Sequence, residues 1–310
     1  MATDAARLPE IDHRRLVGQA RSVDLAFTCA GLLVMVVAMA MLMALIIDLL
    51  VDGLPRLSWD FFTSFPSRRA SRAGILSAWV GTTLVMMVTA ALAVPLGVAA
   101  GVYLEEYAPK NWMTDIIEIN VTNLAGVPSI IYGLLALGLF VYGFGMGETI
   151  LVAGMVLALL TLPVVIVATR EAIRSIPQEV REAAYALGAD QWQTVRIYIL
   201  PAATPGILTG TIIGLARAIG ETAPVITIGA LTFIAFLPPA PIQPDFPFIS
   251  FEWLNSPFTV MPIQMFNWIS RPQEEFHLNA AAAGVVLLAM TLLMNGLAIY
   301  IRYRIRKGLR

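Results

Sequence analysis

The segment that decides the fold is Arg181-Glu182-Ala183-Ala184-Tyr185-Ala186-Leu187-Gly188, which lies in a polar loop between two hydrophobic runs and precedes Leu200-Pro201. Apolar residues recur at helical spacing from Val180 to Leu187, which predicts a short helix with a narrow stripe of small residues. Gly188 is the residue type that most easily adopts the left-handed conformation at a helix end. Such a helix either lies on the membrane surface or docks on a partner, and its periodicity alone leaves both interpretations open.

The residues on either side of this segment predict helix boundaries. Pro177 suits the first turn of the helix, and Ser175 with Gln178 has the spacing of a capping box. Asp190 followed by Gln193 predicts the start of a second helix. The loop is therefore expected to form a helix, a glycine turn and a second helix.

The composition is that of a membrane protein. Of 310 residues, 58% are hydrophobic and 13% charged, about half the charged share of an average soluble domain. The net charge of −1, with no basic stripe, gives no indication of a nucleic-acid partner. The single cysteine, Cys29, excludes an intrachain disulfide and a cysteine-based metal site. His13 and His277 lie in separate polar regions, so we interpret both as solvated or structural.

Six hydrophobic runs predict an all-α polytopic membrane protein with six transmembrane helices, since each is near the ~20 residues needed to cross hydrocarbon. They cover residues 25–47, 78–103, 121–142, 149–168, 206–236 and 280–301. The first run is too long for a signal peptide and is expected to remain as an anchor. Small residues within the runs predict close helix packing; these are Gly97, Gly101, Gly210 and Gly214.

The distribution of Lys and Arg predicts the orientation. With the N-terminus inside, fourteen of the 20 basic residues fall in inner segments, five in outer segments, and Arg217 within a run. By the positive-inside rule, both termini and the polar loop are expected in the cytoplasm. The predicted divisions are a cytoplasmic tail 1–24, a six-helix domain 25–303 with its core at 72–303, a cytoplasmic loop 170–205, an external loop 237–279, and a basic tail 304–310.

The two long outer segments, 52–77 and 237–279, are rich in proline and aromatic residues. Aromatic residues at a membrane boundary commonly form an interfacial belt. The alternative is a surface for an external partner, and the sequence leaves both open. The stretch from Phe258 to Ile269 predicts a short re-entrant or interfacial helix.

Two charged residues lie inside the fifth run. Arg217 is eleven residues past Gly206, which corresponds to roughly 16 Å of helix and places it near the midplane. Glu221 follows at i+4, so both side chains project from one helix face. They either pair to fix helix packing or face a water-filled pathway, the usual role of ionisable residues at this depth.

The polar loop resembles the "EAA" loop of ABC importer permeases. The match covers Glu182, Ala183, Ala184, Gly188, Leu200 and Pro201, and it departs at Tyr198, where that family usually carries Ile. The resemblance implies that this loop, here called the Glu-Ala-Ala loop (170–205), sits in a groove on a cytoplasmic ATPase and couples to it.

A second resemblance concerns the fifth run. Arg217-Ala218-Ile219-Gly220-Glu221-Thr222 is similar to a segment of phosphate importer permeases, and the segments 126–133 and 256–259 with Asn267-Trp268 are similar to the PstA-type subunit. The likeness implies the type I ABC importer permease fold, with Arg217, Glu221 and Thr222 in the substrate pathway.

The resemblance also implies a permease subunit of an ATP-driven importer of inorganic phosphate in a prokaryotic plasma (inner) membrane. The implied partners are a second permease of the PstC type, two ATPase subunits of the PstB type and an external phosphate-binding protein of the PstS type. ATP and Mg are expected on the ATPase, so this chain is expected to hold no cofactor or metal and not to be an enzyme.

Three alternatives remain. An ABC permease for sulfate or molybdate would share the Glu-Ala-Ala loop and differ in the fifth run. A secondary anion transporter usually has inverted repeats, which are not visible in this sequence. A membrane-embedded enzyme would need a catalytic cluster, and the sequence offers no Walker-type loop and no Ser/His/Asp or paired-carboxylate arrangement.

Overall fold

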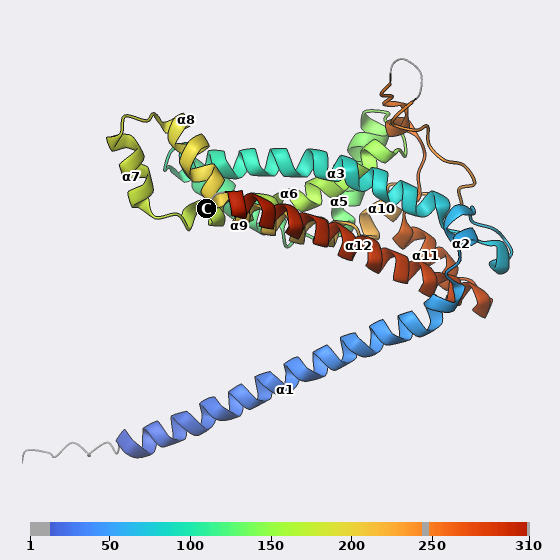
Figure 1. Cartoon of the computed structure of the whole chain (residues 1–310), viewed down its shortest axis with the longest axis horizontal. Coiled ribbons are helices and arrows are strands. Elements are labelled where there is room, and N and C mark those ends of the chain that lie inside the picture. Colours follow the sequence, from blue (N-terminus) through green and yellow to red (C-terminus); the bar gives the residue numbers. More distant parts are fainter. Residues whose placement is uncertain (1–12, 244–247, 309–310) are drawn as a thin grey trace, which may run out of the picture. The chain divides into compact units, whose positions relative to one another are not determined.

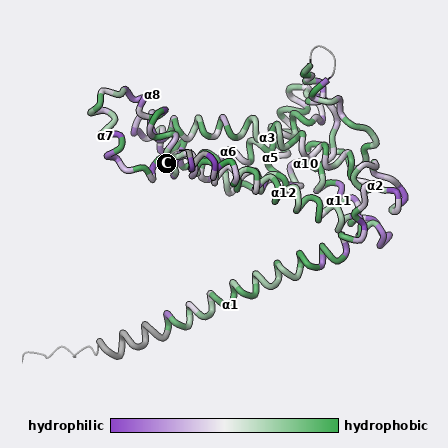
Figure 2. The backbone as a smooth tube through the Cα atoms, viewed as in Figure 1, coloured by the Kyte–Doolittle hydropathy of each residue, from purple (hydrophilic) through white to green (hydrophobic). Residues whose placement is uncertain are grey.

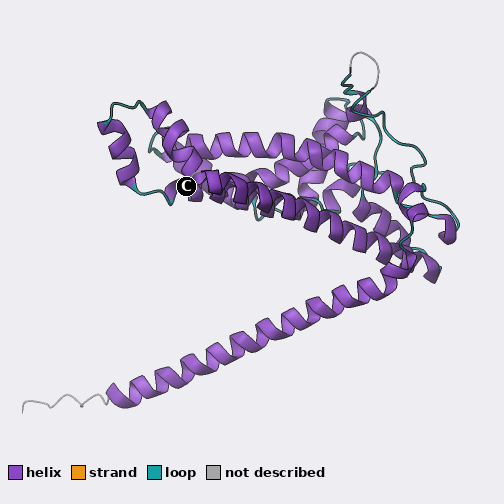
Figure 3. Ribbon diagram, viewed as in Figure 1, coloured by secondary structure: helices purple, strands orange, loops and turns teal. Residues whose placement is uncertain are grey.

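The fold is helical throughout the part of the chain that the computed structural model describes, residues 13–243 and 248–308 (Figures 1 and 3). No strand occurs in these ranges, where one isolated antiparallel bridge joins Ile242 and Ile249. The all-α prediction is confirmed. Residues 1–12 of the predicted N-terminal tail, Phe246 of the external loop and residues 309–310 of the basic tail lie outside the described residues.

The chain divides into two units at Val51. The first contains most of helix α1 (His13–Gly53), which begins inside the predicted tail. From Val23 to Leu45 every side chain of α1 is exposed, and the helix is apolar on all sides. A helix of this kind belongs in lipid or against another membrane protein. The second unit is described over residues 52–243 and 248–308.

The second unit contains eleven further α-helices in its described part, together with short 3-10 and π-helical turns. The 3-10 turns are η1 (Leu54–Arg56), η2 (Ala70–Arg72) and η6 (Glu252–Asn255), and the π-helical segments are η3 (Tyr103–Tyr107), η4 (Leu137–Gly143) and η5 (Thr194–Ile199). The α-helices are α2 (Trp59–Thr63), α3 (Leu76–Val102), α4 (Trp112–Leu124), α5 (Ser129–Ala136), α6 (Ile150–Arg174), α7 (Gln178–Ala186), α8 (Gln191–Gln193), α9 (Leu200–Ala218), α10 (Ala223–Thr227), α11 (Met261–Ile269) and α12 (Glu274–Gly308).

The centre of the unit is α6, which packs against α3 on one side and α9 on the other. Small residues allow this close approach. A Cβ added at Gly97 of α3 would lie 2.7 Å from Val165 of α6, and one at Gly214 of α9 would lie 2.8 Å from Thr161. Contacts this short would force the facing side chains or the helices to shift, so the prediction that glycines mediate close packing is confirmed.

The two ends of the unit carry different short helices. Helices α7 and α8 lie at one end together with the C-terminal end of α12, whereas α2 and α11 lie at the other (Figure 1). Hydrophobic residues follow the long helices between these ends (Figure 2). Over the described residues of both units, five helical stretches are long and apolar enough to cross a membrane, Val23–Arg56 among them, and a bent pair makes six if it counts as one span. The chain is a multi-pass membrane protein.

The third predicted span, 121–142, is wrong as a single continuous helix. Helix α4 ends at Leu124, α5 begins at Ser129, and the two halves are bent by 105°. Pro128 explains the break, because a proline disfavours helical conformation in the residue before it and cannot donate a backbone hydrogen bond. Tyr132 bridges the break by donating its hydroxyl to the carbonyl of Leu124 at 2.9 Å.

The fifth predicted span, 206–236, is wrong in its bounds. The helix begins earlier, with α9 at Leu200, and ends at Ala218. After the short α10, residues 228–236 are not helical. Gly220 and Pro224 interrupt the helix, while the apolar composition that continues to Phe236 gave the impression of one long span.

The helix predicted between Phe258 and Ile269 is confirmed as α11. Its Trp268 is fully buried and lies 6.0 Å from the equally buried Phe61 of α2, measured between ring centroids. Met261 and Phe276 belong to the same buried cluster. For Trp268 and Phe61 the interfacial-belt interpretation is therefore wrong, since these rings form a core between α2, α11 and α12.

Candidate functional site

The Glu-Ala-Ala loop folds as two helical segments joined by a glycine turn. Gly188 has a φ of +85°, in the left-handed region that a side chain disfavours, so the predicted helix end is confirmed. Asp190 and Gln193 form a capping box at the start of α8. The capping box expected at Ser175 is wrong, because the Ser175 hydroxyl instead donates to the carbonyl of Ala172 at 2.8 Å and Pro177 occupies the N-cap of α7.

The apolar stripe of α7 is only partly covered. Ala184 is buried, and Val180 packs against the cluster that contains Ile173 and Ile199. Ala183 is exposed and Leu187 is 81% exposed. One edge of the stripe therefore holds α7 on the rest of the unit, and the other edge is uncovered in this chain.

The remaining residues of the motif lie around this helix. Glu182 is exposed on α7. Leu200 and Pro201 begin α9, which continues without a break from the π-helical segment η5. Tyr198, at the position that departs from the family pattern, lies in η5 and is 40% exposed.

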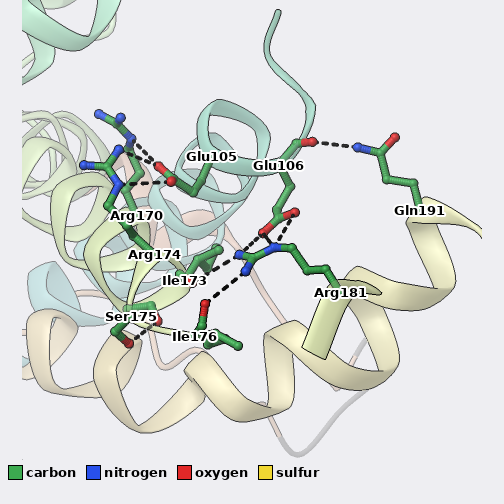
Figure 4. A network of polar contacts seen from close by, with 10 residues as sticks. Glu105, Glu106, Arg170, Ile173, Arg174, Ser175, Ile176, Arg181 and Gln191 are labelled. Carbon is green, nitrogen blue, oxygen red and sulfur yellow. Dashed lines mark hydrogen bonds and ion pairs between the residues drawn. The ribbon is translucent and has the colours of Figure 1, made fainter. Parts of the chain in front are cut away.

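A network of ion pairs joins this loop to η3, the π-helical continuation of α3 (Figure 4). The Arg181 guanidinium of α7 contacts the Glu106 carboxylate at 2.6 Å, and both side chains are largely buried. Arg181 also donates to the carbonyls of Ile176 at 3.1 Å and Ile173 at 3.3 Å. Its guanidinium therefore connects α7, the C-terminal end of α6 and η3.

The same network continues along α6. Arg174 pairs with Glu105 at 2.9 Å, and Arg170 contacts Glu118 of α4 at 2.6 Å. The carbonyl of Glu106 accepts a 2.6 Å hydrogen bond from the side chain of Gln191 in α8. Sequence reasoning missed this network, because its partners come from segments far apart in the chain. The adjacent carboxylates Glu105 and Glu106, just after the second hydrophobic run, were a local sign of a polar site but did not indicate their partners.

The second predicted site lies at the other end of α9. Arg217 is in the last turn of the helix, and its Nε donates to the Glu221 carboxylate at 3.1 Å. The predicted depth counted from Gly206 along one continuous helix, whereas Arg217 lies one residue before the end of α9, beside a helix break. The reason is the early helix end that Gly220 and Pro224 cause. The position of Arg217 near the membrane midplane stays a prediction.

The two partners differ in their surroundings. The Arg217 side chain is 50% exposed and that of Glu221 is 17% exposed. Glu221 lines a small cavity together with residues of α3 and α6, among them Thr82 and Leu157. Within the described residues, the bond from Nε is the guanidinium's one hydrogen bond. Its two terminal nitrogens are thus available to a ligand.

Thr222 completes the predicted pathway set. Its hydroxyl donates to the carbonyl of Gly220 at 3.4 Å, and its backbone carbonyl accepts from the amide of Ile226 at 2.9 Å. Thr222 therefore lies beside Glu221 in the chain, at the start of α10, and shapes the turn after the break. Over residues 13–243 and 248–308, no group of three or more His, Cys, Asp or Glu side chains could hold a metal ion.

Comparison with known proteins defines the class. Residues 93–307 match the family of binding-protein-dependent transport system inner membrane components, and the chain belongs to this family. Among relatives, it is 33% identical over 258 residues to the phosphate transport system permease protein PstA of Yersinia pestis, covering 79% of this chain and 78% of the relative. It is 32% identical over 230 residues to PstA 1 of Mycobacterium tuberculosis strain H37Rv, covering 74% and 70%.

A third relative, the probable ABC transporter permease protein YqgI of Bacillus subtilis, is 36% identical over 202 residues, 65% of this chain and 68% of the relative. Solved structures support the fold. An inward-facing MetNI methionine ABC transporter chain matches with a TM-score of 0.54 at 19% identity, covering 73% of this chain and 94% of that chain. A bacterial alginate ABC transporter chain matches with a TM-score of 0.63 at 14% identity, covering 93% and 97%. The type I ABC importer permease fold is therefore confirmed.

Proposed function

We propose that this chain is a permease subunit of an ATP-driven importer of inorganic phosphate, and that Arg217 contacts the anion. The observation that carries the proposal is the open guanidinium of Arg217, which is half-exposed and bonded to Glu221 through Nε alone. The identity to phosphate permeases of Yersinia pestis and Mycobacterium tuberculosis supports the same substrate.

The chemistry of the site suits phosphate. The two terminal nitrogens of a guanidinium form a planar fork that matches two phosphate oxygens. Near neutral pH phosphate keeps a proton that sulfate lacks, and the Glu221 carboxylate can accept it in a hydrogen bond. The same carboxylate repels the anion. A site with both effects binds weakly and releases readily, as a conduit requires.

The Glu-Ala-Ala loop supplies the energy coupling in this proposal. Its uncovered edge, with Ala183 and Leu187 exposed, is a small apolar surface of the kind that docks in a groove on a partner. We assign this role to an ATPase of the PstB type, which binds ATP and Mg. The exposed Glu182 belongs to the coupling surface, together with Ala183, Ala184, Gly188, Leu200 and Pro201. A PstC-type permease completes the pathway, and a PstS-type protein delivers phosphate from outside.

The docking of the Glu-Ala-Ala loop on an ATPase also gives the orientation of the chain in the membrane. The loop and the C-terminal end of α12 lie at one end of the unit (Figure 1), and the positive-inside rule assigns that end to the cytoplasm of a prokaryote. Helix α11 and the external loop then face the binding protein.

The proposal is tested by reconstituting the purified complex with its partner subunits in liposomes and measuring uptake of labelled phosphate against sulfate and molybdate. We expect ATP-dependent phosphate uptake that neither competitor reduces, and no uptake by this chain alone. Preferred transport of sulfate or molybdate would favour the other-oxyanion permease, and robust uptake without an ATPase would favour a secondary transporter.

A further inference from the structure

Arg181 and Glu106 form a largely buried ion pair, and the role inferred for it rests on the function proposed above. We propose that these two are positioning residues which make α7, α8 and the adjoining end of α3 move as one body. A displacement that an ATPase imposes on the Glu-Ala-Ala loop is then passed directly to α3, which packs along α6 at the centre of the fold.

Glu106 is the point where both helices of the loop meet η3. Its carboxylate receives the Arg181 guanidinium of α7 at 2.6 Å, and its backbone carbonyl receives the amide of Gln191 in α8 at 2.6 Å. One residue at the end of α3 therefore holds both arms of the loop. Figure 4 shows Arg181 at the carboxylate of Glu106 and Gln191 at its backbone carbonyl.

Arg181 uses its whole guanidinium in this contact. Nε and Nη2 donate to Glu106, Nη1 donates to the carbonyl of Ile176, and Nη2 also reaches the carbonyl of Ile173. The last carbonyls of a helix have no partner within the helix, so Arg181 also closes the end of α6. The side chains of Arg181 and Glu106 are only 13% and 7% exposed, which protects the pair from screening by salt.

The backbone between α3 and this pair is unusual. Glu106 lies in η3, a π-helical turn that continues α3, and π-helical turns within α-helices frequently occur at functional sites. The neighbouring pair between Arg174 and Glu105 also joins α6 to η3, but Arg174 is 54% exposed and lies outside α7 and α8. It provides a matched control, because its ion pairs reach Glu105 of η3 and Glu171 of α6, and neither partner belongs to α7 or α8.

The first experiment measures phosphate transported per ATP hydrolysed by the reconstituted complex. Glu106 and Arg181 are both replaced by Met, because removing both charges avoids leaving one of them buried without a partner. We expect the ATPase still to co-purify and hydrolyse ATP, while the ratio falls at least about fivefold, the lower end of typical coupling between sites. The Arg174→Gln control should keep the wild-type ratio.

The second experiment detects the motion itself and needs no transported solute. Spin labels are placed at exposed Ala186 of α7 and Lys110 after η3, in a background where the free Cys29 is replaced by Ser. In the wild type and in Arg174→Gln, the label distance should be the same without nucleotide and with ATP and vanadate. In the double Met variant it should differ between the two states.

These measurements separate the inference from the proposed function. Failure of wild-type complex to move phosphate, with the label distances as expected, would reject the substrate and leave the positioning role standing. A label distance that changes in the wild type, an unchanged transport ratio in the double variant, loss of the ATPase from that variant, or loss of its ATP hydrolysis would each overturn the positioning role.

Discussion

Two Arg–Glu pairs at opposite ends of α9 differ in how much of the guanidinium they use. Arg217 and Glu221 are four residues apart and share one hydrogen bond, and half of the Arg217 side chain is exposed. Arg181 and Glu106 are 75 residues apart in the chain. All three nitrogens of Arg181 donate, and both side chains are largely buried.

The difference shows that the role of an ion pair depends on the donors it leaves free. A guanidinium bonded through Nε alone keeps its fork for a ligand, and an exposed pair of this kind contributes little to stability. A guanidinium whose nitrogens all donate inside the protein has nothing left to bind. Its contribution is to fix the elements that carry its partners, because separating a buried pair leaves a charge unpaired.

The largest expected effect is a loss of phosphate transport when the Arg217–Glu221 pair, here called the open pair because the guanidinium keeps free donors, is changed. Arg217→Gln removes a fork that can form two charge-assisted hydrogen bonds, each of about 1.5–3 kcal/mol, so phosphate uptake should fall on the order of 100-fold or more, given that 1.4 kcal/mol is tenfold. Arg217→Lys should retain little phosphate uptake, since lysine keeps the charge without the planar fork. Uptake by reconstituted complexes is the measurement.

The control for this prediction is the double variant Arg217→Gln with Glu221→Gln. If the pair only fixed helix packing, removing both charges would be tolerated better than removing Arg217 alone. We expect the double variant to remain inactive although the complex assembles, and full activity of the double variant would contradict a role in the pathway. Arg304→Gln, which removes an exposed arginine bonded to Tyr300, should leave uptake unchanged.

The next largest effect is a loss of folding stability when the Arg181–Glu106 pair, here called the closed pair because all its guanidinium nitrogens donate, is broken. Arg181→Gln leaves the buried Glu106 carboxylate unpaired, which should cost about 3–5 kcal/mol of unfolding free energy. Arg217→Gln, at a half-exposed side chain, should cost under about 1 kcal/mol. Thermal unfolding of the purified complexes in detergent should therefore rank Arg181→Gln well below Arg217→Gln. Equal unfolding temperatures would remove the distinction between the two pairs.

The local features of this fold could be predicted from the sequence. Hydrophobic runs of about 20 residues predicted the helices, because the hydrocarbon thickness sets their length. Gly188 predicted its left-handed turn, and Asp190 with Gln193 predicted the start of α8, since both depend on residues close in the chain. The pairing of Arg217 with Glu221 followed for the same reason.

The features that depend on distant residues could not be predicted. Glu106 and Arg181 meet because α3 and α6 run side by side, and no periodicity within either segment reveals that contact. Hydrophobicity also failed to show where a helix stops. Around Pro128 and Gly220 the chain stays apolar while its backbone leaves the helix, so the third and fifth spans were predicted as continuous.

A smaller effect is expected at the turn between the arms of the loop. Gly188→Ala places a side chain at a φ of +85°, which costs about 1–2 kcal/mol, although nothing lies within 4 Å of the added Cβ. Amide exchange across α7 should therefore speed up. Gly145→Ala is the matched control, with a φ of +65° and equally open space far from the loop. In Gly145→Ala the amides of α7 should exchange as fast as in the wild type. Faster exchange of α7 in both variants would point to a general loss of stability.

The smallest effect is expected at the acidic partner of the open pair. Glu221→Gln keeps an amide oxygen that can accept from Arg217 Nε, so the guanidinium should hold its orientation. The substitution removes the repulsion between the carboxylate and the anion, so phosphate should leave the site more slowly. It also leaves an acceptor for the phosphate proton, and uptake should therefore fall only about threefold, equivalent to roughly 0.6 kcal/mol. Uptake at saturating phosphate and the rate of single-turnover phosphate release together measure the hydrogen bond and the repulsion that Glu221 contributes. Phosphate release faster than in the wild type would show that Glu221 attracts the protonated anion more than it repels it.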